Sequence, residues 1–135
     1  MPADSNFFFS QKAMRWEGWI LSVLPAPLLV MGAVMSFLMP PDVEKNMQAM
    51  GWSANVAPII GILNLGSLAL YLIPRTAVLG AILLTGYLGG AVATHLRVGE
   101  TGMCFVPVAF GIVFWLGLYL RDARIRELLP FRKST

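Results

Sequence analysis

Four stretches of this sequence contain no Asp, Glu, Lys or Arg, and each is at least 18 residues long. They cover residues 19–39, 56–73, 77–94 and 103–120. Because a helix rises about 1.5 Å per residue, a helix over each stretch reaches about 27 Å or more, close to the thickness of the hydrocarbon core of a bilayer. The sequence therefore predicts an all-α bundle of four transmembrane helices, with residues 1–135 forming a single membrane domain.

The composition favours a membrane protein over a soluble helical bundle. Hydrophobic residues make up 57% of the chain and charged residues 13%, whereas a soluble domain has about 25% charged residues. A soluble bundle would also need polar stripes at the helical period, and none of the four stretches has one. The first stretch is longer than the core of a signal peptide and is not followed by an A-x-A site, so we expect it to stay in the mature chain.

The basic residues outside the four stretches predict the orientation of the helices. Eight fall on one side of an antiparallel, up-and-down bundle, and two, Lys45 and Arg97, fall on the other. The eight are Lys12, Arg15, Arg75, Arg121, Arg124, Arg126, Arg132 and Lys133. The positive-inside rule then places both termini in the cytoplasm, and we expect a multi-pass protein of a bacterial cytoplasmic (inner) membrane. The basic residues lack an aromatic stacking platform, so we expect no nucleic-acid partner.

The scarcity of cysteine and histidine excludes several classes of membrane chemistry. The chain has one cysteine, Cys104, and one histidine, His95, so it can form neither an internal disulfide nor a tetrahedral metal site made of Cys and His. A haem with two histidine ligands would need a second histidine. A Cys/His enzyme would need a third group to orient the histidine, and none is evident in the sequence. A proton-coupled exporter would need an intramembrane carboxylate, which the four stretches lack.

The first outer connection is the longest and predicts a short interfacial helix over residues 42–50. Asp42 is placed to cap its start, and Gly51 is placed to end it. Val43, Met47 and Met50 fall on one face of this helix. We expect the helix to lie on the membrane surface as a lid on the bundle.

The remaining connections and both ends of the chain predict simple elements. Residues 1–15 lack helical periodicity and predict a mobile or interfacial lead, while Pro25 and Pro27 predict a kink in the first transmembrane helix. Pro74 and Thr76 predict a tight turn that makes the second and third helices antiparallel neighbours. Residues 121–133 predict a basic amphipathic tail lying on anionic lipid.

The third predicted helix is unusually smooth. Small residues recur along it at spacings that let another backbone approach closely. They include Ala81, Gly86, Gly89, Gly90 and Ala93. We expect this helix to be the packing centre of the bundle, with any glycine face left unused available to a second copy or a partner subunit.

Polar side chains of the membrane region gather toward its outer half. Counting residues from the outer boundary places Asn64 and Tyr87 about 10 to 12 Å below that surface, with Ser36, Thr94 and His95 above them. Two interpretations stay open at this point. Asn64 and Tyr87 either hydrogen-bond each other between helices, or they line an outward-opening polar pocket with His95 at its mouth.

Residues 70–99, "LYLIPRTAVLGAILLTGYLGGAVATHLRVG", carry a long and specific pattern. With weaker similarity at "WEGWILS", "PPDV" and "LYLRDARIRELLP", the chain resembles the DoxX-like family of small four-helix membrane proteins, named for a subunit associated with a thiosulfate:quinone oxidoreductase. Relatives often carry an Asp and a Lys in the stretch matching "MGAVMSFLMPP" and a Glu in the stretch matching "GILNLGS". Here Gly32, Ser36 and Asn64 stand at those positions, while His95 and Arg97 keep the pattern. The resemblance implies a site at this layer that has lost its charged chemistry.

These features predict a non-catalytic binding or assembly subunit with an outward-facing polar cleft. The candidate ligand-binding residues are His95, Tyr87, Asn64, Ser36 and Thr94. The expected occupants are a small apolar ligand, a lipid or a partner helix, with no metal and no cofactor. The alternative is a quinone-interacting accessory subunit of a membrane redox complex, in which His95 and Tyr87 hydrogen-bond the carbonyl oxygens of a quinone.

Overall fold

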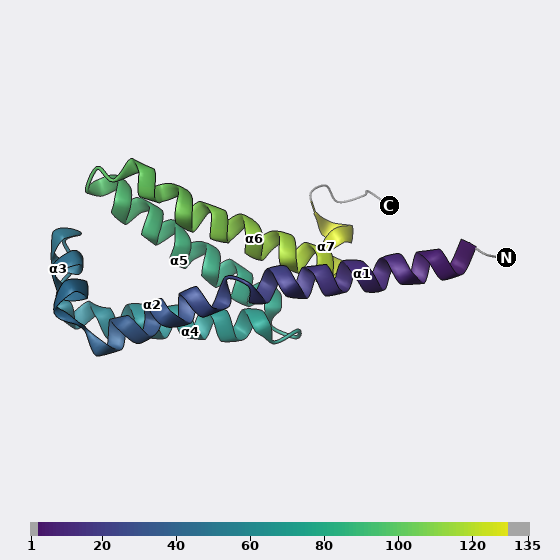
Figure 1. The fold of residues 1–135 in the computed structure, drawn as a ribbon, viewed down its shortest axis with the longest axis horizontal. Helices are drawn as coiled ribbons and strands as arrows, with labels where there is room; N and C mark the ends of the chain where they lie inside the picture. Colours follow the sequence, from purple (N-terminus) through teal and green to yellow (C-terminus); the bar gives the residue numbers. More distant parts are fainter. Residues whose placement is uncertain (1–2, 130–135) are drawn as a thin grey trace.

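The computed structural model describes residues 3–129, which form helices and turns without a strand. Four helical segments are long and apolar enough to cross a membrane: Ser10–Leu38, Ala54–Leu72, Ala77–Arg97 and Thr101–Arg121. They run alternately up and down, so that the start of α1 and the helix α7 lie at one end of the molecule and α3 at the other (Figure 1). The predicted antiparallel four-helix architecture is confirmed.

The first span consists of two helices, α1 (Ala3–Val23) and α2 (Ala26–Leu38), separated by a turn at Leu24 and Pro25. Pro25 and Pro27 lack the N–H groups that would continue the helical hydrogen bonds, so the predicted kink is present as a full break. The break lets the two halves contact different neighbours. α1 packs along α6 (Phe105–Arg121), and α2 packs along α4 (Ala57–Leu72).

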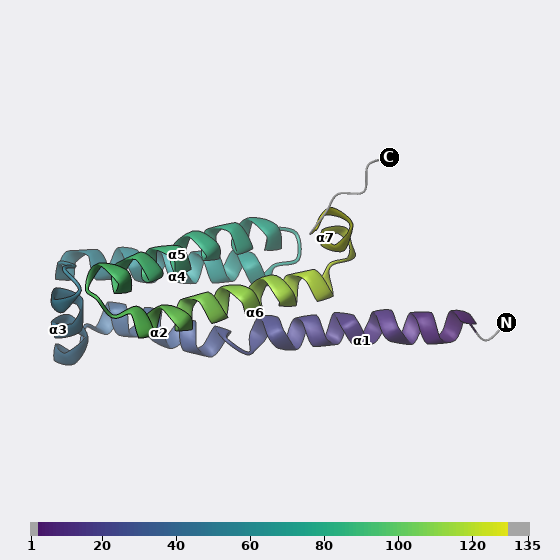
Figure 2. The same cartoon turned by 90° about the horizontal axis from the view of Figure 1, so that it is seen from above.

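The N-terminal region differs from the sequence prediction. α1 begins at Ala3 and its first turns project beyond the ends of the other helices (Figure 2), so residues 3–15 of the predicted mobile or interfacial lead are helical, while residues 1 and 2 lie outside the described part. The residues from Ala3 to Arg15 include neither Gly nor Pro. A helix that is nucleated in the membrane therefore continues outward, even without an amphipathic pattern.

α1 and α6 cross at two glycines. A Cβ atom at Gly18 would lie 2.5 Å from the backbone nitrogen of Arg121, and one at Gly117 would lie 2.7 Å from Ser22 Oγ. Real Cβ atoms do not approach other atoms so closely, so both positions require glycine. The two backbones are in direct contact here, which is how small residues hold helices together where lipid supplies no hydrophobic drive.

A buried polar cluster ties α1, α4 and α6 together beside this crossing. The Tyr71 hydroxyl donates to the Phe114 carbonyl at 2.6 Å and lies 2.9 Å from Ser22 Oγ. The Arg121 guanidinium lies 4.4 Å from the Trp19 ring centroid and 4.5 Å from that of Tyr71, and it donates to the Tyr71 carbonyl. Residues from three helices thus meet around one tyrosine.

α4 and α5 (Ala77–Arg97) join through the tight turn that the sequence predicts. Gly80 lies against the Tyr71 backbone, so a side chain there would clash. Thr76 occupies the N-cap position of α5 without a capping bond, and its hydroxyl donates instead to the Leu70 carbonyl at 2.8 Å. Both contacts close the two helices at this end of the bundle.

The glycines of the smooth helix do not pack against other helices of this chain. Around Gly86, Gly89 and Gly90, apart from the neighbouring residues and backbone of α5 itself, no atom lies within 4 Å of the position a Cβ would take, and Ala93 is exposed. Of the five predicted packing residues only Ala81 is buried, so the prediction that they form the packing centre of the bundle is wrong. The buried residues of α5 are Ala77, Gly80, Ala81, Leu84 and Leu88, and at about 100° per residue they lie on the opposite side of the helix from the three glycines.

At the other end of the molecule α3 (Pro41–Ala49) is the short helix predicted over residues 42–50. Gly51 ends it with φ +75°, and its N–H bonds the Gln48 carbonyl at 2.9 Å while Trp52 N–H bonds the Met47 carbonyl at 2.8 Å. The start of α3 differs from the prediction, because Pro40 is the N-cap and no side chain caps it. The short 3₁₀ turns η1 (Ala54–Val56) and η2 (Thr101–Cys104) lead into α4 and α6.

The C-terminal tail folds back on the bundle. α7 (Ala123–Leu128) is capped by Asp122, whose carboxylate accepts from Arg124 N–H at 3.0 Å. Of three apolar residues in the predicted tail, Ile125 is 4% exposed and packs in the protein core, whereas Leu128 and Leu129 are exposed. The predicted tail continued to residue 133, and residues 130–133 lie outside the described part.

The crossing of α1 and α6 provides a stability test. We expect Gly117→Leu to lower the midpoint of thermal unfolding in detergent, because overpacking at such a contact costs about 1 to 3 kcal/mol. Gly66→Leu is the matched control, since Gly66 is exposed with open space around it, and it should leave the midpoint equal or higher. Equal midpoints for the two variants would contradict the close crossing.

Candidate binding cleft

A cleft of about 590 Å³ lies between α4 and α5 and is closed at one end by α3. Figure 1 shows the two helices diverging from their connecting turn toward α3. Sixteen residues line the cleft, and most are apolar: Ser36, Val43, Met47, Met50, Trp52, Ile60, Leu63, Ser67, Ile82, Leu83, Gly86, Tyr87, Gly90, Ala91, Thr94 and His95. The cleft thus joins α2, α3, α4 and α5, all within the described residues.

The space in the cleft depends on two glycines of α5. Gly86 and Gly90 line it, and nothing approaches within 4 Å of the position where either would carry a Cβ. These glycines therefore create volume where the sequence suggested helix packing. On the opposite side, the predicted apolar face of α3 lines the same cleft through Val43, Met47 and Met50.

The polar side chains of the cleft fall at two levels. Ser36, Thr94 and His95 are near the ends of α2 and α5 beside α3, whereas Ser67 and Tyr87 are deeper. Seven residues of α5 separate Tyr87 from Thr94, which corresponds to about 10 Å along the helix axis. Four of the five predicted site residues are thus brought together at this cleft.

The serine and threonine hydroxyl protons of the cleft are already donated to backbone carbonyls of the protein. Ser36 donates to the Gly32 carbonyl at 3.0 Å, Ser67 to the Leu63 carbonyl at 2.6 Å, and Thr94 to the Gly90 carbonyl at 2.9 Å. Each hydroxyl bonds the carbonyl four residues earlier on its own helix, so its oxygen keeps lone pairs for an outside partner. The Tyr87 hydroxyl makes no hydrogen bond with the described residues and is free to donate.

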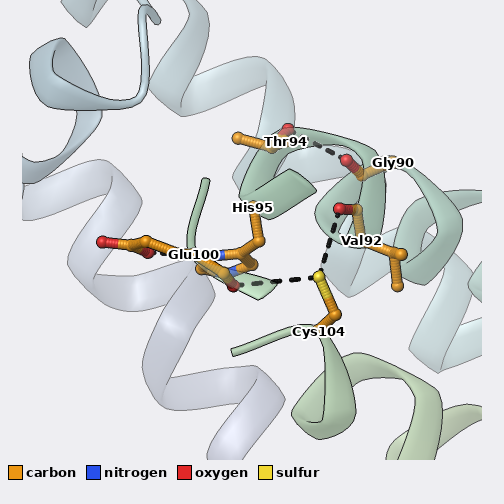
Figure 3. Close-up of polar contacts among 6 residues, drawn as sticks. All are labelled: Gly90, Val92, Thr94, His95, Glu100 and Cys104. Atoms are coloured by element: carbon orange, nitrogen blue, oxygen red, sulfur yellow. Dashed lines mark hydrogen bonds and ion pairs between the residues drawn. The ribbon is translucent and has the colours of Figure 1, made fainter. Parts of the chain in front are cut away.

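His95 is oriented by a carboxylate that the sequence analysis missed. Its Nδ1 lies 3.0 Å from Glu100 Oε2, with the two side chains 17% and 50% exposed (Figure 3). When Nδ1–H donates to this carboxylate, Nε2 of the neutral ring becomes an acceptor. The available signal was an acidic residue five positions after the histidine, in a connection with no other acid.

The single cysteine is near His95 but is directed elsewhere. The Cys104 thiol lies 3.7 Å from the Val92 carbonyl oxygen and 3.9 Å from that of Glu100 (Figure 3). Glu100 is the third group beside the histidine that the sequence analysis did not find. The Cys104 thiol, however, has its hydrogen-bonding partners on the backbone. Activation of a nucleophile would need a thiol bonded to the imidazole. Among residues 10–129, whose side chains are described, no three His, Cys, Asp or Glu side chains are close enough to hold a metal ion.

Asn64 does not belong to the cleft. It is 1% exposed and its Nδ2 donates to the Leu29 carbonyl at 2.9 Å, which ties α4 to α2. Of the two interpretations left open by the sequence, the hydrogen bond between Asn64 and Tyr87 is therefore wrong, and in the pocket interpretation Asn64 is not one of the lining residues. Leu63 faces the cleft, and successive helical residues are about 100° apart, so Asn64 turns toward α2 instead.

Arg97 holds α3 against the end of α5. Its guanidinium donates to the Met50 carbonyl and lies 5.9 Å from the Trp52 ring centroid. Its Nη2 also contacts Gly51, where a Cβ would lie 2.5 Å away. The arginine therefore joins the two sides of the cleft at the end where α3 lies, a role that the sequence analysis did not assign.

The model of the DoxX-like family matches residues 20–117, which contain every residue lining the cleft. The chain belongs to the DoxX-like family. Neither the comparison with curated proteins nor that with solved structures found a match. With its four apolar spans, this DoxX-like chain is an integral membrane protein.

Loss of the arginine contact should loosen α3. We expect Arg97→Ala to raise the rate of backbone hydrogen exchange in residues 41–52 about tenfold, because a charge-assisted hydrogen bond contributes about 1.5 kcal/mol or more. Hydrogen–deuterium exchange mass spectrometry in detergent measures this. Lys45→Ala, which removes an exposed positive charge from α3 itself, should change nothing, and equal exchange in the two variants would contradict the role of Arg97.

Proposed function

We propose that this DoxX-like protein binds a small, largely apolar molecule carrying a hydroxyl group in the cleft between α4 and α5. The volume of about 590 Å³ falls in the range of about 300 to 1,000 Å³ that is typical of ligand sites. Apolar walls with a few polar groups suit a ligand taken from the lipid phase. The protein then acts as a binding subunit, with α3 as the lid of its site.

The donor and acceptor pattern carries this proposal. The Ser36, Ser67 and Thr94 hydroxyls donate to carbonyls of their own helices. His95 directs Nδ1 to Glu100. In an apolar cleft these oxygen and nitrogen lone pairs have few other partners, so a ligand that donates a hydrogen bond is favoured. A hydroxyl meets this need, and its own oxygen can accept from Tyr87.

The quinone alternative makes a different demand on the same residues. The carbonyl oxygens of a quinone are acceptors and would face a set of acceptors, with Tyr87 as the remaining donor when His95 is neutral. The reduced, hydroxylated form would supply the missing donors. In addition, eight residues of α5 separate Tyr87 from His95, about 12 Å along the axis, which is longer than the separation of the two oxygens on one quinone ring.

We infer that the cleft opens toward the outer side of a bacterial inner membrane and that both chain termini are in the cytoplasm. The support is the distribution of charge, because the basic residues are concentrated at the end where α1 begins and α7 lies. The ends of α4 and α5 that diverge then lie on the side away from the cytoplasm. A ligand would enter from the outer leaflet or from the aqueous phase above it.

A matched pair of ligands tests the hydroxyl requirement. We expect 4-nonylphenol to bind the detergent-solubilised protein about tenfold more tightly than 4-nonylanisole, which differs in replacing the hydroxyl by a methyl ether. Titration followed by native mass spectrometry measures both affinities. Thr94→Val should reduce the preference, while Thr85→Val, on the same helix but outside the cleft, should keep it.

Filling the cleft tests whether the ligand binds there at all. We expect Gly90→Leu to remain folded, since open space surrounds Gly90 and leucine favours a helix over glycine by about 1 kcal/mol. It should nevertheless lose binding of the phenol, whereas Gly66→Leu should bind normally. Unchanged binding by Gly90→Leu would refute the site, and a quinone that binds more tightly than its quinol would favour the redox alternative.

A further inference from the structure

A second hollow lies at the opposite end of the molecule from the cleft and is lined by four arginines. They are Arg15 of α1, Arg75 of the α4–α5 turn, Arg121 at the end of α6 and Arg124 of α7. The hollow, which we call the arginine well, has a volume of about 300 Å³. Segments far apart in the sequence therefore bring four positive charges to one place.

These four positive charges face a single carboxylate, which also attracts Arg121. Asp122 is the one acidic residue that lines the well, and its carboxylate accepts from the backbone N–H of Arg124. Among residues 10–129, whose side chains are described, the one ion pair is that of His95 with Glu100 at the other end of the bundle. Four arginines that share a hollow repel one another unless an anion enters it.

Arg121 is the rigid member of the arginine well. The rings of Trp19 and Tyr71 lie 4.4 and 4.5 Å from its guanidinium carbon, and one of its terminal nitrogens donates to the Tyr71 carbonyl. Its other terminal nitrogen, Nη1, is buried and has no hydrogen-bond partner among the described residues. An unpaired buried charged donor is costly, and a nearby negative charge would offset that cost.

We propose that the arginine well binds the phosphate group of an anionic phospholipid. Guanidinium groups match the geometry of phosphate oxygens better than ammonium groups do. The well lies where the apolar spans end, since Arg121 is the last residue of the span Thr101–Arg121 and Trp19 lies on the well's wall. This is the depth of the lipid headgroups, where a basic pocket between helices is suited to an anionic lipid. Inorganic phosphate carries the same chemistry, so the test separates the two sources.

The test titrates the delipidated, full-length protein with soluble short-chain lipids and follows binding by native mass spectrometry. We expect dihexanoyl-phosphatidylglycerol to bind at least tenfold more tightly than dihexanoyl-phosphatidylcholine. Arg15→Ala and Arg75→Ala should each weaken the binding of phosphatidylglycerol about five- to tenfold. Both variants should stay folded, because neither residue belongs to the buried cluster around Tyr71. Gly90→Leu should bind phosphatidylglycerol normally, which keeps this result independent of the cleft.

Two matched variants separate a built site from diffuse attraction. Lys12→Ala removes a positive charge from α1 three residues before Arg15 but outside the well, and Lys45→Ala removes one from the opposite end. Both should bind phosphatidylglycerol like the parent. A loss with Lys12→Ala equal to that with Arg15→Ala, or equal affinity for the two lipids, would overturn the proposal. Inorganic phosphate that competes at equal concentration would overturn the lipid as the source and leave a site for free anions.

Discussion

The break at Leu24 and Pro25 determines which helices the first span can contact. An unbroken helix from Ser10 to Leu38 would lie along one neighbour, whereas the broken span places α1 on α6 and α2 on α4. The Gly18–Gly117 crossing and the cluster around Tyr71 then hold three helices together at the end where α7 lies. Because the close contacts are concentrated there, α4 and α5 are free to diverge toward α3, and the divergence is the cleft.

Glycine has two opposite roles in this bundle. Gly18, Gly80 and Gly117 bring backbones together, and a side chain at any of them would clash. Gly86 and Gly90 have no side chain to fill the cleft, so they leave room between α5 and α3. The same residue type therefore stabilises one end and opens the other. Because the cleft's glycines are not needed for packing, the binding site can vary without cost to the crossing that holds the fold.

The sequence predicts the parts of this structure that depend on one helix at a time. Stretches without charge predict the spans, prolines predict the break, and Gly51 predicts the end of α3. Contacts between helices depend on how each helix is rotated about its axis, which residue counting does not give. Counting placed Asn64 and Tyr87 at a similar depth, yet Asn64 faces α2 and Tyr87 faces the cleft. In the same way a row of small residues shows that a face is smooth but not whether a helix or a cavity lies against it, and the pairing of His95 with Glu100 depends on how the loop folds.

The position of Asn64 gives a physical reason to prefer binding over charge-coupled chemistry in this member. Its amide donates to the Leu29 carbonyl from a site that is 1% exposed, which a carboxylate could do only when protonated. The resemblance implies a Glu in this stretch in many relatives, whereas the amide of Asn64 makes the contact between α4 and α2 without an ionisable proton. Gly32 and Ser36 are also neutral, and the Ser36, Ser67 and Thr94 side chains of the cleft interact with the protein through hydrogen bonds, which suits a site that recognises a hydroxyl.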